Sequence, residues 1–114
     1  MTIRLLQVVI AVLALLPCSR VEAASAAKPA VHTVTIEGTQ FRPGELTVKI
    51  GDSIVWINND PFPHTVTSKT GGFDSPQIQP GKSWKYRAAK KGEFPYICSL
   101  HPTMQATLRP RPMP

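Results

Sequence analysis

Apolar and polar residues alternate with a period of two in several short stretches of this chain. Val34 and Ile36 are separated by a polar residue, and Leu46, Val48 and Ile50 form a second such series. Successive side chains of a strand point to opposite faces, so this alternation predicts two strands that each bury one face.

Later stretches extend the pattern. Residues 53–58 carry apolar side chains on both faces, which predicts a central strand. Residues 83–88 alternate between apolar and polar side chains, and in residues 93–98 every second side chain is apolar. A last short strand is predicted at 105–109. The side chains expected to point inward from the two alternating stretches are Trp84, Tyr86, Ala88, Phe94, Tyr96 and Cys98.

No stretch shows sustained helical periodicity, and the twelve prolines of the chain would interrupt a long helix. Turn-forming Gly, Pro, Asn and Asp residues separate the predicted strands. Seven to eight short strands with such turns between them are typical of an all-β sandwich or barrel. We therefore expect one domain at residues 31–108, preceded by a flexible leader at 24–30 and followed by a Pro-rich tail at 109–114.

The N-terminal residues have the features of a cleaved secretory signal. Arg4 supplies a positive charge, an almost wholly apolar run covers residues 5–16, and a small-residue cleavage pattern follows Pro17. The run is too short to span a bilayer comfortably, which disfavours a membrane anchor. We expect residues 1–23 to be a signal peptide, with Ala24 as the new N-terminus and the periplasm as the destination.

One alternative for this region is lipidation. The segment 15–18 loosely resembles a bacterial lipoprotein processing site, but Pro17 directly before Cys18 spoils the match. Cleavage after residue 23 would remove Cys18 and leave Cys98 as the single cysteine. An odd cysteine in an oxidising compartment is a hazard unless something such as a metal holds it.

Charge limits the class of partner. Removal of the signal peptide lowers the formal net charge from +6 to +5, since Arg4, Arg20 and Glu22 are lost. A moderate positive charge suits an acidic protein partner or simple solubility, and nothing in the sequence calls for nucleic acid.

The segment Cys98 to Met104 contains candidate metal ligands at intervals of three: Cys98, His101 and Met104. A helical stripe would have the same spacing, but Pro102 argues against a helix. A strand end that runs into a tight loop would let all three side chains point at one centre. A buried structural cysteine, a surface histidine and a gap-filling methionine would also explain the trio.

A second histidine strengthens the metal interpretation. His64 follows the most apolar predicted strand and is preceded by Pro63, which fixes its own φ and restricts Phe62 to extended conformations. A lone histidine there would usually be a solvated loop residue. Together with the Cys98 segment, it would supply a fourth ligand.

Two imidazoles, a thiolate and a thioether form a soft donor set. Copper sites of the blue-copper type combine these donors with a weak axial methionine. Zinc also binds histidine and cysteine but gains little from a thioether, and calcium and magnesium need several oxygen ligands. Copper is therefore the metal we expect.

These motifs resemble the cupredoxin family, and within it the amicyanin and plastocyanin group, over about residues 31–108. The resemblance implies a Greek-key β-sandwich that binds one type 1 copper ion and transfers single electrons as a monomer. It implies His64, Cys98 and His101 as strong ligands and Met104 as the axial ligand. The short gap between His101 and Met104 is similar to the ligand loop of amicyanin. The stretches that carry the resemblance are 36–43, 46–52, 55–60, 63–66, 72–75, 78–81 and 96–104.

The sequence departs from the family pattern at three positions. Thr65 stands where the family often has an asparagine that ties the two ligand loops, so a tie to Ser99 is either a hydroxyl contact or missing. Leu100 replaces a frequent proline, and Ala106 a usual glycine. These changes leave the ligand set intact but affect its rigidity and redox tuning.

The resemblance also implies a docking face. His101 would come near the surface within an apolar patch, for which Pro61, Phe62, Pro102 and Thr103 are candidates. A dehydrogenase, a cytochrome or a reductase would be a suitable redox partner. Five cations could steer an acidic partner, or they could be an ordinary solvated strand edge. They are Lys82, Lys85, Arg87, Lys90 and Lys91.

The alternative functions fit the sequence less well. Some require features that the chain lacks, and one leaves the candidate ligand Met104 unused. Multicopper oxidases and copper nitrite reductases need a second, histidine-rich copper centre, and the chain has three histidines. A zinc hydrolase with Asp60 as general base would leave Met104 without a role. A periplasmic copper carrier or scavenger would often expose several methionines, whereas only Met104 and Met113 remain after cleavage. His32, the third histidine, is expected to be exposed and without a role.

Overall fold

The computed structural model describes residues 11–12, 14–15, 17 and 28–113. The expected cleavage site lies outside the described residues, as do most of the expected signal peptide (1–23) and leader (24–30). Within the described part of the chain, no helix has the length and hydropathy needed to cross a membrane.

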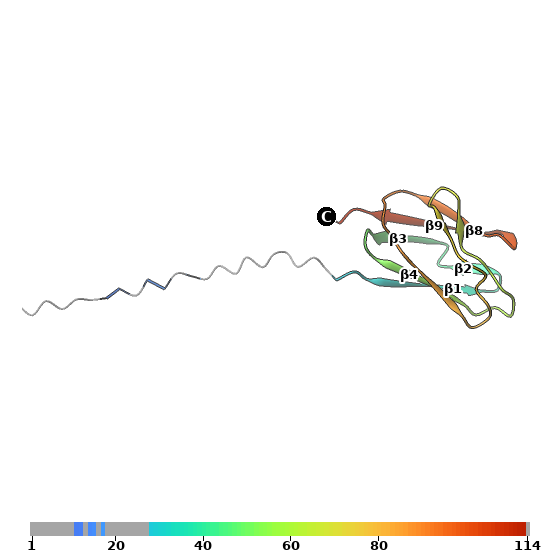
Figure 1. Ribbon diagram of the computed structural model, residues 1–114, viewed down its shortest axis with the longest axis horizontal. Helices are drawn as coiled ribbons and strands as arrows, with labels where there is room; N and C mark the ends of the chain where they lie inside the picture. The colour runs from blue at the N-terminus through green and yellow to red at the C-terminus, as the bar shows by residue number, and fades with distance from the viewer. Residues whose placement is uncertain (1–10, 13, 16, 18–27, 114) are drawn as a thin grey trace, which may run out of the picture.

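The described domain is an all-β sandwich of two sheets (Figure 1). One sheet has the strand order β2-β1-β4-β7 and the other β3-β9-β8-β5-β6, and each contains one parallel pair, β1 with β4 and β3 with β9. The predicted class is confirmed. The strands are β1 (Val31–Glu37), β2 (Gln40–Arg42), β3 (Glu45–Lys49), β4 (Ser53–Asn58), β5 (Thr67–Ser68), β6 (Phe73–Asp74), β7 (Ser83–Arg87), β8 (Phe94–Cys98) and β9 (His101–Arg111).

The predicted burial pattern holds in the strands that form the core. Val34 and Ile36 of β1 are fully buried, as are Ile54 and Trp56 of β4. Strand β4 lies between β1 and β7, which confirms the expectation of a central strand. Two of the nine described strands, β5 and β6, have only two residues each, too few for a periodic pattern to reveal.

Aromatic side chains join the two sheets. Trp56 of β4 donates a hydrogen bond from Nε1 to the Tyr96 hydroxyl of β8 over 3.3 Å, and their rings meet edge to face with centroids 5.7 Å apart. Burial raises the pKa of Tyr96 to about 12. Strands β4 and β8 are thereby fixed to each other. Cys98 is the last residue of β8, and the loop that carries His64 directly follows β4.

The C-terminal segment departs from the prediction. We expected a short strand at 105–109 and a free tail from residue 109, but β9 runs through Arg111 and Pro110 is fully buried. Val48 of β3 pairs with Pro110 in parallel. The Pro110 carbonyl accepts from the Gly92 N–H, on the side of β9 that faces β8, before β8 begins at Phe94. Proline's missing donor therefore falls where no ladder bond is required, and the strand continues.

His32 also departs from the prediction, because it is not idle. Its Nε2 lies 2.9 Å from Oδ2 of the buried Asp52, whose oxygens also accept from the N–H groups of Ala30 and Lys49. The His32 hydrogen bond is the main cause that lowers the pKa of Asp52 to about 2, and the two N–H donors act in the same direction. Asp52 therefore fastens the start of β1 to the turn between β3 and β4.

Candidate metal centre

Three of the predicted ligands converge at one end of the sandwich. Strand β8 ends at Cys98 and, after a two-residue turn, β9 begins at His101. Ile97 pairs with Gln105, but Cys98 pairs with His101, so residues 102–104 bulge out of the ladder. This irregular hairpin is the tight loop that the Cys98 segment required, because a regular ladder would point alternate side chains to opposite faces.

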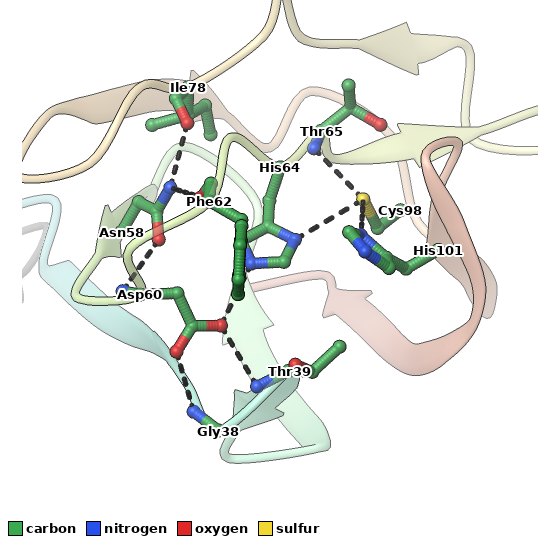
Figure 2. Close-up of polar contacts among 10 residues, drawn as sticks. All are labelled: Gly38, Thr39, Asn58, Asp60, Phe62, His64, Thr65, Ile78, Cys98 and His101. Atoms are coloured by element: carbon green, nitrogen blue, oxygen red, sulfur yellow. Dashed lines mark hydrogen bonds and ion pairs between the residues drawn. The ribbon is translucent and has the colours of Figure 1, made fainter.

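The donor atoms of these residues face one another (Figure 2). The Nδ1 atom of His64 lies 3.6 Å from the Cys98 Sγ, and Nδ1 of His101 lies 4.0 Å from it. All three donor atoms lie within 4.8 Å of one another. Bonds of about 2.0–2.3 Å to nitrogen and sulfur place donors of one ion roughly 3–4 Å apart, so this triangle could hold a transition-metal ion. His64 and Cys98 are fully buried, whereas His101 is half-buried.

The backbone around His64 is fixed by a buried asparagine. Asn58 donates from Nδ2 to the carbonyls of Phe62 and Ile78 over 2.7 and 2.8 Å, and its Oδ1 accepts from the Asp60 N–H. His64 and Ile78 exchange backbone hydrogen bonds of 3.1 and 2.7 Å. The loop that carries His64 therefore has a set shape before any metal binds. The role of Asn58 could not be read from the sequence, because its partners are backbone carbonyls that no motif marks.

The carboxylate of Asp60 determines which nitrogen of the His64 ring points at Cys98. Its Oδ1 accepts from the Gly38 N–H at 2.7 Å, and Oδ2 lies 2.9 Å from the Thr39 N and 2.8 Å from the His64 Nε2. Burial raises the pKa of Asp60, but these donors outweigh burial and hold the pKa below its ordinary value. An ionised carboxylate only accepts, so Nε2 carries the proton and Nδ1 presents its lone pair to the metal position.

This arrangement changes the role considered for Asp60. The sequence suggested it only as the general base of a hypothetical zinc hydrolase. Both of its oxygens are engaged with protein donors and it is 7% exposed, so it is not free to activate a water molecule. In the sequence, the only indication of the pairing between Asp60 and His64 is that the acid precedes the candidate ligand by four residues. That signal was too weak to identify the pairing.

Thr65 ties the two ligand segments together through its hydroxyl group. Its Oγ1 accepts from the Ser99 N–H at 2.8 Å and lies 2.9 Å from the Ser99 Oγ, while its own N–H points at the Cys98 Sγ over 3.3 Å. Of the two possibilities left by the absent asparagine, the structure has the hydroxyl contact. Thr65 Oγ1 also lies 3.0 Å from the hydroxyl of Thr67, which donates to Asp74.

Met104, the predicted axial ligand, lies in the bulged part of β9 and is 3% exposed. It belongs to the hydrophobic core and follows His101 by three residues. Its burial at this end of β9 agrees with the expected role, which stays a prediction. Of the other two departures from the family pattern, Ala106 is buried opposite Tyr96 and Leu100 is 43% exposed.

The residues considered for an apolar patch near the half-buried His101 are all exposed. Phe62 is 58% exposed, and Pro61, Pro102 and Thr103 are exposed as well. Leu100, which was not among the candidates, lies in the turn directly before His101 and is 43% exposed. The five candidate steering cations are all exposed, and β7, which carries two of them, is an edge strand.

Comparison with known proteins identifies relatives of this chain. Residues 7–108 match the model of a family described as "Cupredoxin-like domain". Amicyanin-alpha of Methylorubrum extorquens is 27% identical over 97 residues, which cover 81% of this chain and 82% of that protein. The chloroplastic plastocyanin of Tetradesmus obliquus is 31% identical over 72 residues, 54% of this chain and 50% of that protein.

Solved structures give the same result. A Cu(I) form of an amicyanin variant superposes with a TM-score of 0.66 at 26% identity, covering 77% of this chain and 88% of that one. The copper-containing nitrite reductase of Thermus scotoductus SA-01 superposes with a TM-score of 0.67 at 28% identity. That match covers 73% of this chain but only 22% of the reductase.

Proposed function

The chain belongs to the cupredoxin family, and on that premise we propose that it is an exported carrier of single electrons that holds one type 1 copper ion. The residues that would hold the ion are His64, Cys98 and His101, together with Met104. The observation that carries the proposal is the convergence of two imidazole nitrogens on one buried thiol.

The donor set fits copper better than other common ions. Cys98 is buried and forms no disulfide within the described part of the chain. Its thiolate, two imidazoles and a buried thioether form a soft-to-borderline donor set, which favours copper over oxygen-seeking ions. When bound, copper would supply a one-electron Cu(II)/Cu(I) couple. The amicyanin structure solved in its Cu(I) form is that of a relative with the same fold.

The residues of this chain hold the donors in place during the change of oxidation state. His64 is fixed by Ile78 on its backbone and by Asp60 on its ring, while Cys98 receives the Thr65 N–H. Buried donors with fixed partners move little, so a change of charge at their centre costs little rearrangement. That property suits rapid electron transfer.

Exposed apolar residues in the two ligand segments support docking of a redox protein near His101. His101 is the most accessible of the three convergent donors. Two large apolar side chains in the ligand segments are exposed: Phe62, two residues before His64, and Leu100, directly before His101. A basic edge at Lys85 and Arg87 of β7 would attract an acidic partner at longer range. The partner would be a dehydrogenase, a cytochrome or a reductase.

We propose no enzymatic activity. The third histidine, His32, binds Asp52 beside the start of β1, so it does not join the other two in a second copper centre. The likeness to the nitrite reductase covers about a fifth of that enzyme and supports a shared fold rather than a shared reaction.

Export and domain limits complete the proposal. Residues 1–23 would be removed as a signal peptide and residues 24–30 would form a leader in the periplasm. The folded domain would begin at Val31 and, because β9 includes Arg111, extend past residue 108.

Copper reconstitution tests the proposed function. The purified chain without residues 1–23 should develop an intense visible absorption with Cu(II) and show a reversible one-electron wave in voltammetry. Cys98→Ser should abolish the absorption, because the thiolate is its source. The exposed-site control Ser83→Ala should retain both signals. Binding of Cu(I) without a reversible wave would instead indicate a copper carrier.

A further inference from the structure

We propose that Asp60 is a positioning residue that acts through the His64 ring to favour the oxidised state of the copper site. This inference rests on the proposed function. It concerns the chain's own carboxylate, which is held at the far side of the ring from the cysteine (Figure 2).

The carboxylate is fixed in position as well as charged. Its two oxygens accept three hydrogen bonds, from Gly38 and Thr39 just after β1 and from the ring of His64. Its own N–H is bound to Asn58. At 7% exposure it is held against the ring by partners on two different segments, so it cannot swing into water when the charge of the site changes.

Electrostatics predicts which oxidation state of copper this arrangement favours. The thiolate of Cys98 brings one negative charge to the donor triangle, and Asp60 adds a second one beyond a single imidazole ring. Buried charges are weakly screened, and a fixed negative charge stabilises a doubly charged cation more than a singly charged one. A carboxylate that accepts from a ligand imidazole also makes that imidazole a more basic donor. Both effects favour Cu(II).

A purely structural role for Asp60 would have different consequences, and the chain contains a matched control. Asp52 is also buried, and it also accepts from two backbone N–H groups and one histidine. It lies beside the start of β1, whereas Asp60 lies beside the end, roughly 20 Å away along seven strand residues. At that distance its charge is largely screened from the site.

The experiment compares Asp60→Asn with Asp52→Asn in the copper-loaded protein at a fixed pH of about 7. Asp60→Asn should shift the Cu(II)/Cu(I) equilibrium at least tenfold toward Cu(I), a rise of about 59 mV in the reduction potential for one electron. Asp52→Asn should shift it less than threefold. A folded Asp60→Asn protein with a shift below threefold, or an equal shift in both variants, would overturn the proposal.

A second measurement uses the metal-free wild-type protein. It requires no copper, and it does not depend on whether the variants fold. Nitrogen NMR of wild-type His64 should show the tautomer with the proton on Nε2, as the contact with Asp60 requires. A proton on Nδ1 would refute the arrangement on which the inference depends. Loss of reversible voltammetry in the wild type would refute the proposed electron transfer instead, and the NMR result would still decide the Asp60–His64 contact.

Discussion

Replacing Thr65 by valine tests whether one hydroxyl group holds the two ligand segments together. Valine keeps the shape and the backbone N–H that points at Cys98, and it removes only Oγ1. That atom accepts from the Ser99 N–H at 2.8 Å and contacts the hydroxyls of Ser99 and Thr67 at 2.9 and 3.0 Å. The perturbation is therefore confined to hydrogen bonding with Thr67 and with Ser99, which is 34 positions away.

The magnitude follows from which partners can find other hydrogen bonds. Each lost intramolecular hydrogen bond costs about 0.5–1.5 kcal/mol net, and more if a buried group is left unsatisfied. Ser99 is exposed, so its hydroxyl can turn to water, and Thr67 keeps its bond to Asp74. The Ser99 N–H at 2.8 Å is the main loss. We expect Thr65→Val to lower the free energy of unfolding of the metal-free protein by about 1–2 kcal/mol.

Urea unfolding of the metal-free protein, followed by fluorescence, measures this free energy. The m-value should stay the same, since the change leaves the buried area almost unchanged. Thr33→Val, at an exposed position of β1, is the control and should change stability by less than about 0.5 kcal/mol. A Thr65→Val protein as stable as the wild type would show that the tie contributes nothing, and the reasoning would fail.

Two further predictions concern pH and docking. Because hydrogen bonds lower the pKa of folded Asp52 to about 2, its contribution to stability is present above the ordinary carboxyl pKa of 3.8 and is lost as the pH falls toward 2. Asp52→Asn should flatten the dependence of unfolding free energy on pH between about 4 and 2, and an unchanged slope would contradict that assignment. Phe62→Ser should lower the electron self-exchange rate of the copper protein, measured by NMR line broadening, roughly tenfold while sparing its visible spectrum. Val31→Ser, at another exposed apolar position, should leave the rate unchanged, and equal rates in all three proteins would exclude the patch as a contact surface.

The strands of this fold were predictable where the alternation of apolar and polar residues shows which face is buried. The alternation at Val34 and Ile36 and the apolar stretch that contains Trp56 led to the correct strands, because side chains of a strand alternate between faces. Pro110 was misassigned for a related reason. Proline argues against a strand unless its missing donor falls where no partner is needed, and that condition arises here because β8 begins only at Phe94.

The candidate ligands were visible in the sequence for a chemical reason: the trio of Cys98, His101 and Met104, taken together with His64 in a second loop, forms the donor set of a blue-copper site. The sequence by itself therefore determined which longer strands to expect, which residues are the candidate donors and which metal suits them. Only the tertiary structure decided how those donors are held. Asp60 meets Gly38 across 22 positions and Thr65 meets Ser99 across 34. Such pairs form because two sheets pack face to face, and no local pattern in the chain encodes which distant polar groups that packing brings together.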